Sequence, residues 1–134
     1  LNLLKDLQRE TGVALIFVTH DLGIVAKMCD KVAVMYAGKI VEYRAVRELF
    51  SDPKHPYTKA LLGSVPKLGS KAPLETIPGQ PPNLASLPPG CHFHPRCAVV
   101  MPRCSLEEPR NFSLDDGGLA RCWLVEHQVE VAHG

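Results

Sequence analysis

Proline and cysteine are concentrated in the second part of this chain, and this uneven distribution limits what each part can fold into. All 12 prolines lie within residues 53–109, and four of the five cysteines lie within residues 91–122. Proline lacks a backbone N–H donor and disfavours helix at the preceding residue, so the proline-rich stretches should be extended. We therefore predict two differently built regions, an α/β region over 1–52 and an irregular, loop-rich region over 53–134.

Length and charge narrow the class of protein further. A chain of 134 residues has the size of one domain and is too short for a complete nucleotide-driven motor. The 15 Lys and Arg residues nearly balance the 14 Asp and Glu residues, so no strong field favours nucleic acid as a partner. The longest apolar run, over 13–18, is far shorter than the ~20 residues of a membrane-spanning helix, and no signal peptide opens the chain. These features are typical of a soluble protein.

Hydrophobic periodicity in the first region predicts helices and strands. Residues 13–18 are continuously apolar and rich in β-branched side chains, which favours a strand buried on both faces of a parallel sheet. A tight turn is expected at Ala37-Gly38, because two residues separate two strand-like runs. The expected elements are a helix over 1–11 ending at Gly12, a strand over 13–18, a helix over 22–29 capped by Asp21 or Thr19, strands over 31–36 and 39–43, and a helix over 45–50.

His20 is the candidate ligand-contacting residue of the first region. It follows the expected strand at 13–18 directly, within the sequence Thr19-His20-Asp21. In open α/β sheets, ligands bind beyond the carboxyl ends of the strands. By position alone, a ligand-contacting histidine and a histidine that only caps a loop are equally good interpretations.

The sequence around His20 resembles the end of an ABC-transporter ATPase domain, which is a P-loop fold. The resemblance covers Phe17-Val18-Thr19-His20-Asp21-Leu22 and continues from Cys29 to Glu42. In that family the matching residue is the switch histidine, which contacts the γ-phosphate of ATP. The resemblance therefore implies that His20 is a catalytic and nucleotide-contacting residue, with ATP and Mg²⁺ as cofactors, while Asp21 orients the loop.

Several motifs of that family are missing from the chain. It contains no G-x-x-x-x-G-K-[ST], and thus neither the backbone cradle nor the lysine that hold the β- and γ-phosphates. The family's glutamine loop, signature motif, magnesium-binding Asp and catalytic Glu are also missing, and all of them precede the switch histidine. The resemblance implies a C-terminal piece of a longer ATPase, and this piece alone is expected to be inactive.

The segment His55-Pro56-Tyr57-Thr58 predicts the start of a short docking helix, because proline is favoured at the first helical position. It also matches a segment that follows the ATPase core in oligopeptide and dipeptide importers, a subfamily that imports nickel and related solutes as well. That subfamily usually has Glu-x-Gly where this chain has Glu42-Tyr43-Arg44, so no role is carried over to Arg44.

The resemblance further implies that the proline-rich segment is ordered by packing around Ile77-Pro78-Gly79.

Four cysteines of the second region are candidate metal ligands. They are Cys91, Cys97, Cys104 and Cys122, separated by five, six and 17 residues. Zinc sites usually contain C-x₂₋₄-C pairs, and a reducing compartment disfavours disulfides. A [4Fe–4S] cluster is larger than a single ion and accepts looser spacing between its cysteine ligands. The spacing therefore favours a cluster slightly over Zn²⁺, with disulfides third and four free thiols last. Arg96 and Arg103 are expected to add positive charge nearby, and Cys29 is expected to be a packing residue.

The cysteine region resembles the C-terminal extension of the peptide-importer ATPases. The matching residues run from Gly90 to Cys97 and include Cys104, Glu107-Glu108-Pro109 and Cys122. Some members of that subfamily carry a [4Fe–4S] cluster there. The resemblance implies that these four cysteines hold one cluster, with Zn²⁺ as the alternative and with His92 and His94 as minor alternative ligands.

Three functions follow as hypotheses. The resemblance implies an ATP-binding, energy-coupling subunit of a peptide-type ABC importer. Such a subunit works with transmembrane permease subunits and a second ATP-binding subunit at the cytoplasmic face of the membrane, and does not bind the peptide itself. The alternative is a metal-stabilised docking or regulatory module without catalysis, and the third hypothesis is a redox sensor.

Overall fold

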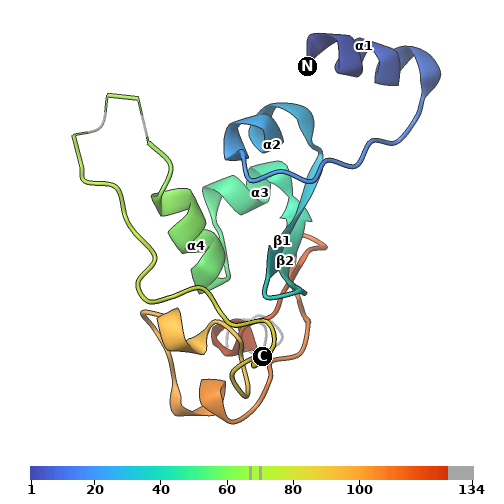
Figure 1. Ribbon diagram of the computed structural model, residues 1–134. Coiled ribbons are helices and arrows are strands. Elements are labelled where there is room, and N and C mark those ends of the chain that lie inside the picture. Colours follow the sequence, from blue (N-terminus) through green and yellow to red (C-terminus); the bar gives the residue numbers. More distant parts are fainter. Residues whose placement is uncertain (67, 70, 127–134) are drawn as a thin grey trace.

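A computed structural model describes residues 1–66, 68–69 and 71–126, which form a mixed α/β fold around a small antiparallel sheet (Figure 1). The sheet has the strand order β1-β2-β4-β3. In chain order, the elements are the helices α1 (Asn2–Thr11) and α2 (Leu22–Met28), the strands β1 (Lys31–Tyr36) and β2 (Lys39–Ala45), the helices α3 (Val46–Ser51) and α4 (Pro56–Gly63), the 3₁₀ turns η1 (His94–Arg96) and η2 (Pro102–Ser105), and the strands β3 (Phe112–Ser113) and β4 (Leu119–Ala120). No helix in these described ranges has the length and apolar character needed to cross a membrane.

The β1–β2 hairpin is confirmed where the sequence predicts it. Tyr36 pairs with Lys39 across a turn in which both Ala37, at φ 48°, and Gly38, at φ 81°, have positive φ. Such a turn matches the right-handed twist of the two strands, which explains why a non-glycine residue is held in this conformation. The second strand runs two residues beyond the expected end, to Ala45.

The expected helices α1, α2 and α3 are confirmed within one or two residues. Gly12 ends α1 with φ 70° and donates to the Gln8 carbonyl at 2.8 Å. Asp21 caps α2, since its carboxylate accepts from the backbone N–H groups of Gly23 at 2.9 Å and Ile24 at 3.2 Å. Local signals therefore account for the end of α1 and the start of α2.

The expected strand at 13–18 is wrong for this structure, and so is the expected parallel sheet. The segment has no strand pairing and is largely exposed, with Ile16 93% and Val18 98% exposed. A strand buried on both faces needs neighbouring strands to pair its backbone N–H and C=O groups, and no described strand lies beside this one. The segment therefore passes as an extended connection between α1 and α2 (Figure 1).

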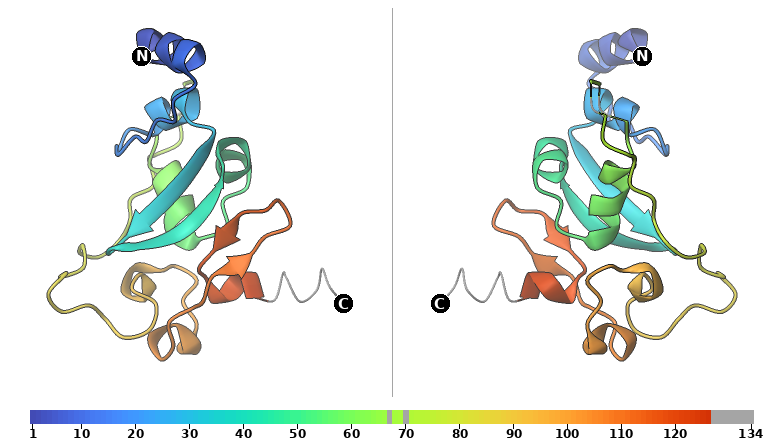
Figure 2. Two further views of the ribbon diagram at one scale, coloured as in Figure 1. Left: turned by 90° about the vertical axis from the view of Figure 1, so that its right-hand side faces the viewer. Right: turned by 90° about the vertical axis from the view of Figure 1, so that its left-hand side faces the viewer.

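Two apolar clusters form the core. One lies between the hairpin, α3, α4 and the turn before η1, and the other lies within the last part of the chain. The first contains Val34, Tyr36, Val41, Leu49 and Phe93, and the second contains Cys104, Phe112, Ala120, Cys122, Trp123 and Val125. Cys91 packs against both clusters, and η1 and η2 lie near the turn end of the hairpin (Figure 2).

The sheet crosses the boundary expected at residues 52 and 53. Strand β4 pairs with β2 in the register Glu42 with Ala120 and Tyr43 with Leu119. The backbone N–H of Arg121 donates to the Val41 carbonyl at 2.8 Å and extends this connection. The two regions therefore share backbone hydrogen bonds, and the division into two domains stays a prediction.

Candidate functional site

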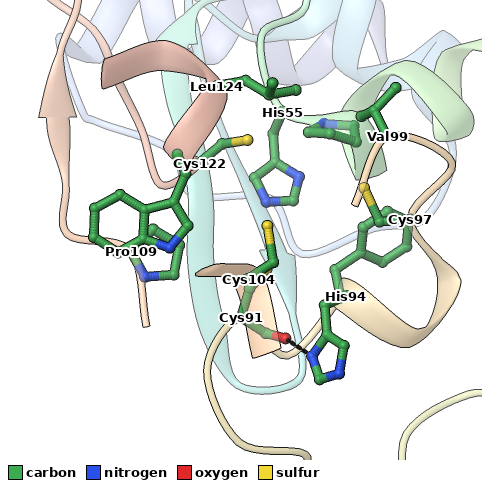
Figure 3. Close-up of a pocket in the computed structure, with 12 residues that line it drawn as sticks. His55, Cys91, His94, Cys97, Val99, Cys104, Pro109, Cys122 and Leu124 are labelled. Atoms are coloured by element: carbon green, nitrogen blue, oxygen red, sulfur yellow. Dashed lines mark hydrogen bonds between the residues drawn. The ribbon is translucent and has the colours of Figure 1, made fainter. Parts of the chain in front are cut away.

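The four cysteines of the second region line one recess (Figure 3). Cys91 precedes η1, Cys97 follows it, Cys104 lies in η2, and Cys122 follows β4. The recess is small and partly open to solvent, and its wall also includes His55, Phe93, Pro109 and Trp123. The structure thus brings together all four cysteines predicted from the sequence.

Gly90 allows the first cysteine to approach the third. The backbone N–H of Cys91 donates to the Cys104 carbonyl at 2.7 Å, and the N–H of Met101 donates to the Cys104 Sγ at 3.4 Å. Gly90 has φ 71°, and a Cβ at this position would overlap the Cys104 carbonyl. Glycine is therefore required here both for its positive φ and for the close contact with η2.

The environment of the recess disfavours ionised thiols. Burial, together with smaller contributions from the other three thiols, raises the pKa of the Cys122 thiol to about 11. Burial also raises the pKa of Cys91 and Cys97, with added repulsion from neighbouring thiols. Only thiolates bind metals strongly, so Cys91, Cys97 and Cys122 are protonated and weakly reactive at neutral pH unless a cation stabilises their ionised forms.

The donor set fits an iron–sulfur cluster in number and chemistry. All five cysteines of the chain are free thiols, and four of them line the same recess. Across the described ranges, no group of three or more His, Cys, Asp or Glu side chains is placed to hold a metal ion. The thiols therefore match the ligands of a [4Fe–4S] cluster in number and kind, but they do not form a preorganised metal site.

The minor alternative ligands His92 and His94 face different cavities. His94 lines the cysteine recess, and its Nδ1 lies 2.8 Å from the Cys91 carbonyl oxygen. His92 lines a second cavity together with Lys39 and Glu108. Cys29 lies at the end of α2, outside the recess. Of the two histidines, only His94 therefore lines the recess that holds all four cysteines.

The two arginines expected to lie near the thiols are engaged by other side chains and by the backbone. Arg96 donates from Nε to the Pro78 carbonyl at 2.9 Å and from a terminal nitrogen to the Tyr36 hydroxyl at 3.3 Å. Arg103 pairs with Glu126 at 2.8 Å and stacks 3.5 Å from the Trp123 ring. Arg96 thus ties the proline-rich segment to the hairpin, and the expected effect of both arginine charges on the thiols stays a prediction.

His55 is a residue of the recess that the sequence analysis assigned only to a helix start. It is the N-cap of α4, and its Nδ1 accepts from the Tyr57 N–H at 3.0 Å. Its backbone N–H donates to the Glu42 carboxylate at 2.9 Å. Only 1% of His55 is exposed, and this burial lowers its pKa to about 4 although a hydrogen bond to the backbone of Arg121 opposes the shift. The imidazole is therefore neutral at physiological pH.

Arg44 is a second residue that the sequence analysis left without a role. Its side chain is 4% exposed and pairs with Asp116 and with Glu42, which is fully buried. It also donates to the Asp52 carbonyl. Glu42 in turn accepts from the backbone N–H groups of Lys54 and His55. This network connects β2 to the start of α4, and its only sequence signal is the departure from the Glu-x-Gly pattern.

His20 lies far from this recess, at the other end of the hairpin. It is exposed and directly precedes the Asp21 cap of α2. The Thr19 hydroxyl accepts from the Asp21 N–H at 3.0 Å and fixes the turn. The Asp21 carboxylate is engaged by helix amides, as expected for a residue that orients the loop. The nucleotide role of His20 stays a prediction.

Comparison with known proteins extends these observations. A family model described as the oligopeptide/dipeptide transporter, C-terminal region, matches residues 41–104. The dipeptide transport ATP-binding protein DppD of Bacillus subtilis is 47% identical over 133 residues, which cover 98% of this chain and 40% of the relative. The oligopeptide transport ATP-binding proteins OppD of Haemophilus influenzae and Salmonella typhimurium are 46% and 48% identical, covering 98% and 92% of this chain. The two matches span 41% and 37% of those relatives, so the chain covers about two fifths of each protein.

Proposed function

This chain belongs to the oligopeptide/dipeptide family of ABC transporter ATP-binding subunits, whose C-terminal portion it matches, and from that premise we propose that it serves energy coupling in a peptide importer. The observation that carries the proposal is the similarity over 98% of the chain to a dipeptide transport ATP-binding protein. ATP and Mg²⁺ would be held largely by phosphate-binding motifs that these 134 residues lack. The chain would then supply the switch region and the C-terminal extension of such a subunit.

In this proposal His20 contacts the γ-phosphate of ATP. Its exposed position supports this role, because an exposed imidazole beside a fixed helix start can reach a ligand bound by another part of the protein. Asp21 holds the first turn of α2 through the N–H groups of Gly23 and Ile24. Positioning matters here because phosphoryl transfer depends on the placement of donors around the phosphate and the attacking water.

The proposed partners are transmembrane permease subunits and a second ATP-binding subunit at the cytoplasmic face of the cell membrane, with the peptide bound elsewhere. The exposed apolar side chains of the first region support burial against further protein. Leu3 is 70% exposed on α1, and Ile16 is 93% exposed in the following segment. In the proposed arrangement, residues 1–52 belong to the ATPase domain and residues 53–134 form its extension.

We also propose that the extension holds one [4Fe–4S] cluster through Cys91, Cys97, Cys104 and Cys122, with Zn²⁺ as the alternative. Support comes from the four free thiols around one recess and from the small size of the neighbouring apolar cluster. When bound, the cluster would cross-link four separate loop positions and stabilise them. A docking or regulatory role of the extension is the second candidate function, because its recess and apolar cluster do not depend on His20.

A chimeric subunit tests the main proposal. The matching 133 residues of Bacillus subtilis DppD would be replaced by this chain, and ATP hydrolysis and dipeptide uptake would be measured. We expect the chimera to support both activities, and we expect His20→Ala to reduce turnover strongly with little change in ATP affinity. Lys27→Ala on the exposed face of α2 is the control. An active His20→Ala chimera would contradict the role of His20, and a folded chimera without uptake would contradict the proposed function.

A further inference from the structure

We propose that Arg103 is a positioning residue that holds Cys104 and Cys122 in place relative to one another before any metal binds. The inference deepens the proposed cluster site and rests on that proposal for its purpose. The contacts that carry it lie within the protein chain and join η2, with the residues just after it, to the residues that follow β4. The central contact is made by Arg103 and Trp123, which are the immediate neighbours of the two cysteines.

The guanidinium of Arg103 stacks on the indole of Trp123, with 3.5 Å between its central carbon and the ring centroid. A cation this close to an aromatic face is attracted by the ring quadrupole, and tryptophan offers the strongest such face. Arg103 lies in η2 one residue before Cys104, and Trp123 comes one residue after Cys122. The stack therefore joins the two cysteine-bearing segments directly beside the thiols.

Two hydrogen bonds fix how the stacked groups are oriented. A terminal nitrogen of Arg103 donates to the Glu126 carboxylate at 2.8 Å, and the indole N–H of Trp123 donates to the Glu107 carbonyl at 3.0 Å. The first bond runs from η2 to the end of the described chain, and the second runs back to the residues just after η2. Neither segment can therefore slide along the other without breaking one of these bonds.

The stack is buried on the side of the indole and open on the side of the arginine. Trp123 is 6% exposed and meets the Phe112 ring edge-on, with 5.8 Å between the ring centroids. The side chain of Arg103 is 45% exposed. Trp123 also lines the recess together with Cys104 and Cys122, whose side chains Figure 3 shows. Loss of the guanidinium should therefore loosen the two cysteines while the indole stays packed on Phe112.

Three substitutions separate the stack from the ion pair, and a fourth serves as the control. Arg103→Met keeps an apolar side chain but loses the charge and the planar group, and Arg103→Lys keeps a cation for the ring. Glu126→Gln removes the charge of the partner and leaves the stack. Arg110→Met is the matched control, because the Arg110 guanidinium lies 4.6 Å over the Phe112 ring only two residues away in the sequence. It makes the same kind of contact without joining distant segments.

Alkylation of the metal-free, reduced chain is the first measurement, with each cysteine followed by peptide mass spectrometry. We expect Cys104 and Cys122 to react about fivefold faster in Arg103→Met than in the wild type, because the reaction reports local opening. Arg110→Met should leave both rates unchanged, and Arg103→Lys should restore most of the protection. Wild-type rates at both cysteines in Arg103→Met would overturn the proposal, and so would an equal acceleration in Arg110→Met.

Two further readings distinguish a loss of positioning from a general loosening of the fold. Cys29, which lies outside the recess, should react at its wild-type rate in Arg103→Met. The fluorescence of Trp123, the single tryptophan of the chain, should keep the emission of a buried indole. An equal acceleration at Cys29 would contradict the proposal. If Arg103→Met does not fold, Glu126→Gln carries the test and should accelerate both recess cysteines about twofold.

Loss of iron and sulfide to a chelator is the second measurement, made on chains reconstituted with both. Faster loss from Arg103→Met than from Arg110→Met supports the positioning role, and equal loss from the two contradicts it. If the wild-type chain takes up no iron and sulfide, the cluster proposal fails. The alkylation rates of the metal-free chain then still decide the role of Arg103.

Discussion

The guanidinium of Arg44 pairs with the carboxylate of Asp116, 72 residues further along the chain, and joins β2 to the loop before β4. The hydrogen bond from Arg44 Nε to Asp116 Oδ2 is 2.9 Å long. Gly118 lets the two segments approach, because a Cβ there would overlap the Arg44 side chain and the Tyr43 carbonyl. The pair thus anchors the second region to the hairpin.

Arg44→Met should destabilise the chain strongly. The substitution leaves the Glu42 carboxylate fully buried without its cationic partner, and removing one member of a buried pair costs about 3–5 kcal/mol. The free energy of unfolding measured in urea checks this. Lys39→Met, which breaks the more exposed pair with Glu108, is the control and should cost less than about 1 kcal/mol. Equal effects of the two substitutions would refute a buried network.

The ion pair should also make stability depend on pH. Burial pushes the pKa of Asp116 upward, but hydrogen bonds from Arg44 and the Gly118 N–H, with the charges of Arg44 and Lys54, bring it below its usual value. A carboxylate with a lowered folded-state pKa stabilises the fold above its unfolded value of about 4, and this contribution is lost as the pH falls through the folded-state pKa. The free energy of unfolding of Asp116→Asn should therefore be lower than that of the wild type at neutral pH. This difference should shrink as the pH is lowered. A difference independent of pH would contradict this prediction.

The hairpin and the helix ends could be predicted because their signals are local. Ala37-Gly38 defines a turn and Asp21 a cap within a few residues of sequence. Strands β3 and β4 have two residues each, too few to show a period; β4 is defined by its pairing with β2, and β3 by its pairing with β4. Conversely, residues 13–18 have the composition of a buried strand but no described neighbour to pair with. Whether a segment forms a strand therefore depends, in both cases, on pairing partners that are distant in the sequence.

The candidate site could be predicted only in part, for a similar reason. The four cysteines stand out by residue type, so spacing and resemblance identified them before the recess was known. Arg44 gains its role from a contact with Asp116, 72 residues away in the sequence, and His55 gains its role from a contact with the Glu42 carboxylate on β2. Neither contact has a local pattern that a sequence could reveal.

Gly90→Ala should disrupt the cysteine recess more than an equivalent change elsewhere. Gly90 and Gly117 both have positive φ, at 71° and 84°, so alanine is strained by about 1–2 kcal/mol at either position. Only at Gly90 would the added Cβ also overlap a backbone carbonyl, that of Cys104, whereas Gly117 has open space. Thermal unfolding should show the larger loss for Gly90→Ala, with faster alkylation of Cys91 and Cys104. Matching effects of the two substitutions would rule out the close contact.

The 134-residue chain by itself should not hydrolyse ATP. It lacks the phosphate-binding loop, the magnesium-binding Asp and the catalytic Glu, and one histidine cannot replace the donors that phosphoryl transfer requires. Phosphate release from the purified chain should equal that of the buffer. Release above that background that is lost in His20→Ala would contradict the prediction, whereas release that persists in His20→Ala would indicate a contaminating enzyme.

The four cysteines should hold one iron–sulfur cluster that stabilises the extension. Anaerobically prepared chain should be brown and contain about four irons and matching acid-labile sulfide. Serine in place of Cys91, Cys97, Cys104 or Cys122 should remove the colour and lower the unfolding temperature, because the bound cluster contributes folding energy to the loops it joins. Cys29→Ser is the control, since Cys29 lies at the end of α2 and outside the recess. If the purified chain contains one equivalent of zinc and no acid-labile sulfide, the same thiols form a zinc site and not a cluster. Disulfides formed under reducing conditions would exclude both the cluster and the zinc site.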